Sequence, residues 1–322
     1  MAMMLTLAVA ISLPALPPVV AAALMQAEPP PPPPPPPLHD RRQFLGVRRD
    51  LALRARLLAG GAQQTAALAQ AGEEALPAAF DSRERWPRCI HPIRDQGRCG
   101  ACWAFGTSEA FSDRLCIASA GRINVVLSAE QLLDCNLLGL ESSCTGGDQA
   151  TASEYIIARG LVSDDCYPYT KRHGGNASKC EKQCSPNATD RSWVPHRAKA
   201  GSLRWLVTER AIQQEIFARG PVVSCFAMYT DFQKAGDGRV YSHGPNATSK
   251  GPLSDGHCIK VLGWGVQPAN ASTGTAATPY WLIANSWGSS WGVLGGYFRM
   301  VRGANEGDIE REAFSLEPEL TA

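Results

Sequence analysis

The sequence predicts an α+β fold of two lobes, with a helical first lobe, a strand-rich second lobe and a cleft between them. From Cys102 to about Ser119 the apolar residues recur at mixed three- and four-residue spacings, which favours a helix. Three short apolar runs further along the chain are bounded by glycine and proline, as strands usually are: Val222–Phe226, Cys258–Leu262 and Tyr280–Ala284. A helical half followed by a strand-rich half indicates two lobes.

The segment over residues 1–23 is apolar and uncharged and ends in small residues, a pattern that predicts a cleaved signal peptide. An uncleaved membrane anchor is the alternative. However, Pro14, Pro17 and Pro18 interrupt the run and would break a spanning helix. We therefore expect no membrane span in the mature form.

Two further segments precede the globular part of the chain. Residues 24–40 form a proline-rich linker, in which the unbroken run Pro29–Pro37 favours an extended polyproline spacer. Residues 41–75 are rich in Ala, Leu, Arg and Gln and contain no cysteine, which indicates a separate short helical segment. From Leu76 onward Trp, Gly, Pro and Cys occur throughout, which indicates a globular domain over residues 76–322.

Glycosylation sequons and cysteines both bear on the compartment. Four Asn-Ala-Ser/Thr sequons agree with secretion, and they start at Asn176, Asn187, Asn246 and Asn270. We expect the secretory pathway, with a lysosome or acidic vacuole, or the extracellular space, as the destination. In an oxidising compartment most of the 11 cysteines should be bridged, and their odd number leaves at least one thiol unpaired.

The charges are balanced, with 31 basic residues against 30 acidic residues and a formal net charge of +1. This balance gives no electrostatic reason to expect nucleic acid or an anionic membrane surface as a partner. The binding partners of the protein have to be inferred from its catalytic or binding motifs instead of from its net charge.

The stretch Gln96–Phe105, read QGRCGACWAF, contains two cysteines three positions apart. A Cys-x-x-Cys pair alone fits a zinc site, a redox pair or two unrelated sulfurs. Here Cys99-Gly-Ala-Cys102-Trp is followed far downstream by Asp-Gly-His257-Cys and by Ala-Asn285-Ser-Trp-Gly. Three such motifs in this order resemble the papain-like cysteine peptidases. The separation from Cys102 to His257, 257 − 102 = 155, is slightly longer than the usual spacing of roughly 130–150.

The subfamily that the chain resembles is cathepsin B, from about Leu76 to Leu316. Blocks similar to that subfamily are Leu76–Asp81, Arg94–Gly97, Trp103–Gly106, Gly220–Val222, Leu262–Gly265 and Ile309–Glu312. Gln43–Val47 is similar to a piece of its inhibitory propeptide, so the resemblance makes residues 41–75 a short pro-region. It implies peptide and protein substrates, the chain's own pro-region as an inhibitor, cystatin-like inhibitors as partners, and no metal or other cofactor.

The resemblance assigns catalytic roles to four residues. Cys102 at a helix N-terminus would be the nucleophile, because the helix dipole stabilises a thiolate. His257 would take its proton and later protonate the leaving amine. Asn285 would orient the His257 ring, and Gln96 would donate a hydrogen bond to the oxyanion together with the backbone N–H of Cys102. Taken singly, each of these residues also fits an ordinary structural role. Only the four together, in this order and within their motifs, favour catalysis.

The cysteine pairing also follows from the resemblance. It implies four bridges, each worth roughly 2–4 kcal/mol: Cys89–Cys116, Cys99–Cys144, Cys135–Cys180 and Cys166–Cys184. Cys225 and Cys258 remain. A fifth bridge or two buried free thiols both fit, because bridging needs Cα atoms within about 7 Å, which the sequence cannot show.

Further residues are implied to bind substrate. Gly146 and Gly147 would offer backbone hydrogen bonds to an extended peptide, and Trp287 would shield the histidine–asparagine bond. Glu312 matches the glutamate at the base of a substrate pocket whose walls would include Cys225 and Cys258. Asp148 stands where the subfamily has an aromatic residue. We expect arginine to be accepted two residues before the scissile bond, unless the Asp148 and Glu312 carboxylates are solvated or already paired.

One departure from the subfamily concerns its occluding loop. That loop usually carries its own disulfide and two adjacent histidines, which bind the C-terminal carboxylate of a substrate. Here Pro168–Asn176 leads almost directly to Cys180 and contains only His173. We therefore expect an endopeptidase with weak or absent release of C-terminal dipeptides.

Two other classes of function compete with this interpretation. One is a catalytically weak or inactive secreted relative that acts as a binding protein. Such relatives typically lose the nucleophile, whereas Cys102 is present here. The other is acyl transfer of the transglutaminase kind, which uses similar Cys–His chemistry. The Gln96 and Asn285 motifs argue against it.

Overall fold

The computed structural model describes residues 75–136, 143–170, 179–243, 253–269, 272, 274 and 276–320. The predicted signal peptide, the linker and, apart from Ala75, the pro-region lie outside these residues. The sequon asparagines Asn176, Asn246 and Asn270 also lie outside them.

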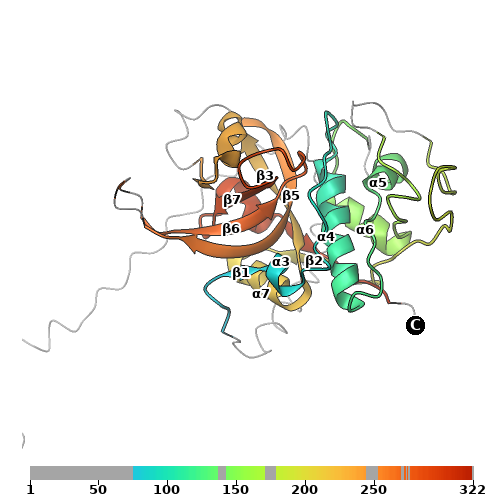
Figure 1. Ribbon diagram of the computed structural model, residues 1–322, viewed down its shortest axis with the longest axis horizontal. Helices are drawn as coiled ribbons and strands as arrows, with labels where there is room; N and C mark the ends of the chain where they lie inside the picture. The colour runs from blue at the N-terminus through green and yellow to red at the C-terminus, as the bar shows by residue number, and fades with distance from the viewer. Residues whose placement is uncertain are drawn as a thin grey trace, which may run out of the picture. The chain divides into compact units, whose positions relative to one another are not determined.

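The first lobe is built around α4 (Cys102–Ala118), with the shorter helices α5 (Ala129–Cys135) and α6 (Gln149–Ala158) on one side of it and the sheet on the other (Figure 1). Every side chain of α4 from residue 102 to residue 116 is buried. A helix buried on all sides occupies the centre of a fold. The predicted helix from Cys102 to about Ser119 is confirmed.

The helix starts follow the rules of N-capping. The Ser128 hydroxyl accepts the Gln131 amide at 3.0 Å at the start of α5, and the Asp148 carboxylate accepts the amides of Ala150 and Thr151 at 2.8 and 3.0 Å at the start of α6. By contrast, α4 has no side-chain cap. Its first turn therefore keeps backbone N–H groups available for other partners.

The second lobe is a sheet in the order β2-β8-β3-β5-β6-β7-β4, with β1 also paired to β5. All pairs are antiparallel except β4 with β7. The strands are β1 (Phe80–Asp81), β2 (Arg204–Leu206), β3 (Val222–Tyr229), β4 (Val240–Tyr241), β5 (Leu253–Gln267), β6 (Thr278–Ala284), β7 (Tyr297–Val301) and β8 (Ala313–Ser315). The three predicted runs lie in β3, β5 and β6, so the strand-rich second half is confirmed.

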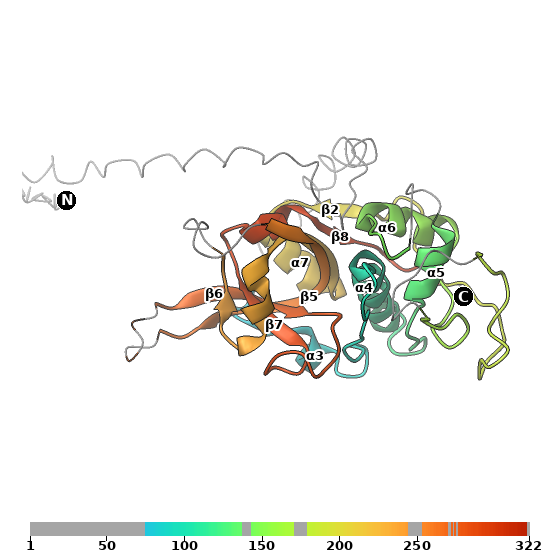
Figure 2. The same ribbon diagram turned by 90° about the horizontal axis from the view of Figure 1, so that it is seen from above.

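Three helical elements accompany the sheet, and a short α3 (Ser82–Arg85) follows β1. They are α7 (Glu209–Arg219) and the 3₁₀ segments η4 (Thr230–Asp237) and η6 (Glu306–Arg311). Helix α7 starts at the Thr208 cap and ends at Gly220, whose φ of 96° suits glycine. Figure 2 shows β8 and β2, at one edge of the sheet, running towards α6.

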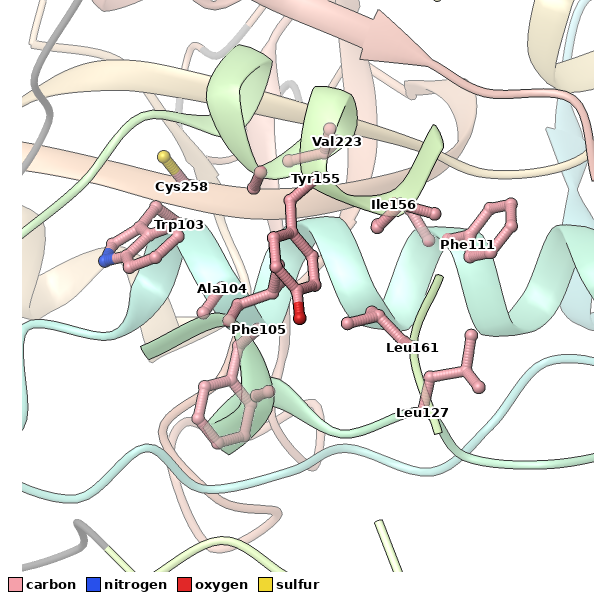
Figure 3. Close-up of a cluster of buried hydrophobic side chains, with 14 of the residues drawn as sticks. Trp103, Ala104, Phe105, Phe111, Leu127, Tyr155, Ile156, Leu161, Val223 and Cys258 are labelled. Atoms are coloured by element: carbon pink, nitrogen blue, oxygen red, sulfur yellow. The ribbon is translucent and has the colours of Figure 1, made fainter. Parts of the chain in front are cut away.

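The chain has two apolar cores, and the first is formed by α4, α5 and α6 together with residues of β3, β5 and β8. Figure 3 shows this core, where Phe105 and Phe111 of α4 lie near Tyr155 and Ile156 of α6. The second core lies within the sheet lobe and is rich in aromatic residues, among them Phe226, Phe232, Trp264, Trp281 and Phe298. No helix in the described part of the chain is long and apolar enough to cross a bilayer.

Buried charges on α4 connect the two lobes. The Arg114 guanidinium pairs with Glu215 of α7 at 2.5 Å and donates to the carbonyl oxygens of Leu316 at 2.6 Å and Gly220 at 3.0 Å. Arg114 and Glu215 are both nearly inaccessible to solvent. Breaking such a buried pair leaves a charge without its partner, so this contact holds the lobes together.

Candidate active site

Cys102 is the first residue of α4, the position where the helix dipole acts most strongly on a side chain. No acidic residue lies in the first turn to oppose that effect. All 11 cysteines lie in the described residues, and Cys102 is the one that has no disulfide partner. A thiol at this place is suited to ionise.

His257 lies in β5 and Asn285 directly follows β6, and the two side chains are hydrogen-bonded. His257 Nε2 and Asn285 Oδ1 are 2.8 Å apart, and both residues are buried. Because Asn285 Oδ1 also accepts the Ser286 amide at 2.9 Å, this oxygen faces the ring as an acceptor. His257 Nε2 is therefore the donor, and Nδ1 is the nitrogen that can take up a proton.

The N-terminal end of α4 lies against the part of β5 that carries His257. Helix α4 packs on β5, and Cys102, Trp103 and Cys258 belong to one buried cluster. Figure 3 shows Trp103 and Cys258 close together. Since Cys258 directly follows His257, the fold brings the predicted nucleophile and the predicted base to the same region.

Trp287 covers the histidine. Its ring centroid is 4.9 Å from that of His257, with 34° between the planes. Phe226 and Phe232 add rings at 5.8 and 6.0 Å from the imidazole. The histidine–asparagine bond is thus surrounded by aromatic side chains, which keep water away from it.

The Gln96 side chain is held at both ends of its amide. Its Oε1 accepts the Ser286 hydroxyl at 2.6 Å, and its Nε2 donates to the Cys99 carbonyl oxygen at 2.8 Å. One Nε2 hydrogen is used by Cys99, so the second can reach another acceptor. Ser286 was not among the predicted site residues, although it stands within the Asn-Ser-Trp-Gly motif.

The segment that carries Gln96 is paired with the segment that follows Asn285. Gln96 N donates to Ser286 O at 2.8 Å, Gly288 N donates to Arg94 O at 2.9 Å, and Asp95 forms a β-bridge with Trp287. Two stretches that are far apart in the sequence therefore form one hydrogen-bonded unit beside His257.

The glycines assigned to substrate binding lie next to α4. A Cβ atom at position 147 would overlap the Trp103 ring, so only glycine fits there. Gly146 has a φ of 105°, which also favours glycine. The next residue, Asp148, is buried and caps α6, so its carboxylate is already paired, which was one of the alternatives for it.

Cys225 and Cys258 form a fifth disulfide, a question that the sequence left open. The two residues are directly opposite each other in β3 and β5, with Cα atoms 4.0 Å apart. Cys225 N donates to Glu312 O at 3.4 Å, and Gln149 Nε2 lies 3.4 Å from Glu312 Oε2. The fold thus brings Glu312, the bridge and the start of α6 together.

The four predicted bridges are present: Cys89–Cys116, Cys99–Cys144, Cys135–Cys180 and Cys166–Cys184. The Cys99–Cys144 bridge does not include Cys102, so the two cysteines in QGRCGACWAF do not act as a unit. Of the four sequon asparagines the structure describes Asn187, which is exposed.

A buried charge cluster between α4 and β5 was not predicted. Lys260 Nζ lies 2.7 Å from Asp113 Oδ2 and 3.9 Å from Glu109 Oε2, and all three residues are at most 3% exposed. Burial raises the pKa of Glu109 to about 7, with Lys260 opposing the shift. Burial favours a lower pKa for Lys260, but Asp113 and Glu109 outweigh it and hold that pKa above its usual value.

Comparison with known proteins agrees with these features. The model of the papain family cysteine proteases matches residues 76–316. Cathepsin B-like cysteine proteinases 6 and 5 of Caenorhabditis elegans are each 36% identical; the matches cover 77% of this chain and 68% and 76% of those proteins. The solved structure of procathepsin B S9 from Trypanosoma congolense has a TM-score of 0.66 at 31% identity, covering 86% of this chain and 84% of that one. A digestive procathepsin L 3 of Tenebrio molitor has a TM-score of 0.58 at 26% identity, covering 76% and 71%.

The resemblance seen in the motifs, the two-lobed α+β fold and the cysteine-type peptidase class are thereby confirmed. The chain belongs to the papain family of cysteine proteases and is cathepsin B-like.

Proposed function

We propose that the protein is an endopeptidase that cleaves peptide bonds through a Cys102–His257 pair and an acyl-enzyme thioester. The observation that carries the proposal is the His257 Nε2–Asn285 Oδ1 hydrogen bond of 2.8 Å, because it leaves Nδ1 to take the thiol proton. The thiolate attacks the carbonyl carbon, and the C=O electron pair moves to oxygen. When the tetrahedral intermediate collapses, the C–N bond breaks and His257 protonates the leaving amine. Water, deprotonated by His257, then hydrolyses the thioester.

The oxyanion of each tetrahedral intermediate is stabilised by Gln96 Nε2 and the backbone N–H of Cys102. The hydrogen bonds of Gln96 to Ser286 and Cys99 support this role, because they fix the amide before substrate arrives. Loss of one such donor costs roughly 10²–10³ in kcat. We expect Gln96→Ala to lower kcat by that factor.

The peptide substrate binds in an extended conformation along Gly146 and Gly147, with backbone hydrogen bonds as in strand addition. Trp287, Asp148, Glu312 and the Cys225–Cys258 bridge complete the binding region. Arginine two residues before the scissile bond is accepted because of the Glu312 carboxylate. The ratio of arginine to phenylalanine substrates should fall in Glu312→Ala and stay constant in the exposed control Glu319→Ala; equal ratios would contradict this role.

Cleavage is internal to the substrate and does not remove C-terminal dipeptides efficiently. The basis is the short stretch between Pro168 and Cys180, which lacks an extra cysteine pair and adjacent histidines. Residues 171–178, including His173, lie outside the described residues. A peptide with both ends blocked should be cut, whereas stepwise release of dipeptides from a free C-terminus would contradict this mode.

Regulation and location follow the same family pattern. The segment 41–75 inhibits the enzyme until it is removed, and the enzyme acts in a lysosome, an acidic vacuole or the extracellular space. Procathepsin relatives support an inhibitory pro-region. Adding a synthetic 41–75 peptide to enzyme that lacks this segment should reduce hydrolysis.

Labelling with an epoxysuccinyl inhibitor tests the central proposal. The inhibitor should modify the wild-type protein at Cys102 and abolish hydrolysis, and Cys102→Ala should be neither labelled nor active. Stoichiometric peptide binding without hydrolysis by the wild type would instead favour the binding-protein alternative.

A further inference from the structure

Phe232 lies at the centre of the aromatic cluster beside the catalytic histidine. It belongs to η4, directly after β3, and is 0% exposed. Its ring centroid is 6.0 Å from that of His257 and 5.6 Å from that of Trp287. It also contacts four further rings, those of Phe226, Tyr241, Trp291 and Phe298.

The orientation of Trp287 depends on perpendicular ring contacts. Phe232 meets it at 78° between the planes, and Trp291 meets it at 87° with centroids 5.2 Å apart. Edge-to-face pairs of this kind are favourable, and a rotation of the indole would disrupt both. Phe232 and Trp291 therefore both restrict rotation of the Trp287 ring, and Phe232 also lies beside the His257 ring.

Phe232 is itself held by its neighbours. The preceding residue, Asp231, accepts the Tyr241 hydroxyl at 2.9 Å and lies 3.0 Å from His243 Nδ1 through the same carboxylate oxygen. The Tyr241 ring packs perpendicular to Phe232 with centroids 5.2 Å apart. These contacts connect η4 to β4 and leave Phe232 little freedom to move.

We propose that Phe232 is a positioning residue for the catalytic histidine: it holds Trp287 against His257 and helps to exclude water from the His257–Asn285 hydrogen bond. The inference rests on the proposed Cys102–His257 mechanism. During catalysis His257 carries a positive charge, and aromatic rings stabilise a nearby cation. Phe232 contributes to that stabilisation both directly and through Trp287.

The test is Phe232→Leu, which removes the ring but keeps an apolar side chain. Its matched control is Phe298→Leu. Phe298 is also 0% exposed and contacts Phe232 and Trp291, but among the ring contacts of the described residues it has none with His257 or Trp287. Both variants retain Asp231, Tyr241 and His243, which are titratable residues beside Phe232. Activity is normalised by epoxysuccinyl titration of Cys102, so that unfolded protein is not counted.

The pH profile of kcat/KM is the readout that a merely structural role would not move. In Phe232→Leu we expect the alkaline limb to shift down by about half a pH unit, the size that an ordinary cation–π contact corresponds to. We expect kcat to fall about tenfold from misplacement of the base, with KM little changed. In Phe298→Leu the pH profile should match that of the wild type. Phe232→Tyr, which keeps an aromatic ring at position 232, should also have the wild-type profile.

Identical profiles for the wild type and Phe232→Leu would overturn the inference, as would equal shifts in both leucine variants. If Phe232→Leu does not fold, Phe232→Met replaces it with the same expected outcomes, because methionine fills irregular space adaptably. Failure of the proposed function is a different result: the wild type itself would show no hydrolysis that depends on Cys102.

Discussion

Replacing Glu109 by glutamine should remove a pH-dependent loss of stability. The Glu109 carboxyl is wholly buried, and burial raises its pKa from 4.5 to about 7. In the unfolded chain the proton leaves near the ordinary value, whereas the folded protein keeps it up to about pH 7. Between these two values the folded state binds more protons, so stability falls as the pH rises.

The size of the effect follows from the two pKa values. Their difference, 7 − 4.5 = 2.5, corresponds to ~3 kcal/mol of unfolding free energy lost by the time the pH has passed 7. The loss is absent well below pH 4.5. Lys260, Asp113, Arg94 and His91 are the charged or titratable groups that act on Glu109, and the variant retains all four.

Urea unfolding between pH 4 and pH 8 measures the effect, with Cys102→Ala as the background to prevent self-digestion. The unfolding free energy of Glu109→Gln minus that of the parent should increase by ~3 kcal/mol as the pH is raised from 4 to 8. Glu319→Gln, a change at an exposed glutamate, should run parallel to the parent. If the Glu109→Gln curve also runs parallel to the parent, the carboxyl is not protonated in the folded state and the reasoning is wrong.

Three further predictions follow from the contacts of single residues. Gly147→Ala would push against the Trp103 ring, so kcat/KM should fall on the order of 10²; an unchanged value would contradict the close packing. Arg114→Met leaves the buried Glu215 without one of its cations and should cost about 3 kcal/mol in urea unfolding, whereas a loss below about 1 kcal/mol would mean that the pair is unimportant. Alkylation of the unfolded, unreduced chain should label Cys102 alone, and three labelled thiols would disprove the fifth disulfide.

The candidate site residues that the sequence could indicate are those that stand within contiguous motifs. Cys102, His257 and Asn285 are each surrounded by residues that identify them, and the helix that begins at Cys102 has a readable apolar spacing. The Cys225–Cys258 bridge could not be predicted in the same way. It depends on the pairing register of β3 with β5, and only the folded sheet brings the two residues opposite each other.

The buried charges could not be predicted for a different reason. In the sequence, Glu109, Asp113 and Arg114 resemble the polar face of a surface helix, but α4 is enclosed by both lobes and the three side chains find buried partners. Phe232 stands in a short 3₁₀ segment, and all six of its ring contacts are with residues outside that segment, which only the folded chain brings to it. Helix α7 was not among the predicted elements, although Thr208 and Gly220 mark its two ends.

The pairing of residues 94–96 with residues 286–288 has a consequence for the motions of the site. Relative movement of the two lobes cannot separate Gln96 from Asn285 unless the hydrogen bonds between these backbone segments break first. Gln96, the proposed oxyanion donor, and Asn285, the proposed partner of the catalytic histidine, therefore open and close together. In a hydrogen-exchange experiment the amides of Gln96 and Gly288 should exchange at a common rate, as members of one cooperative unit.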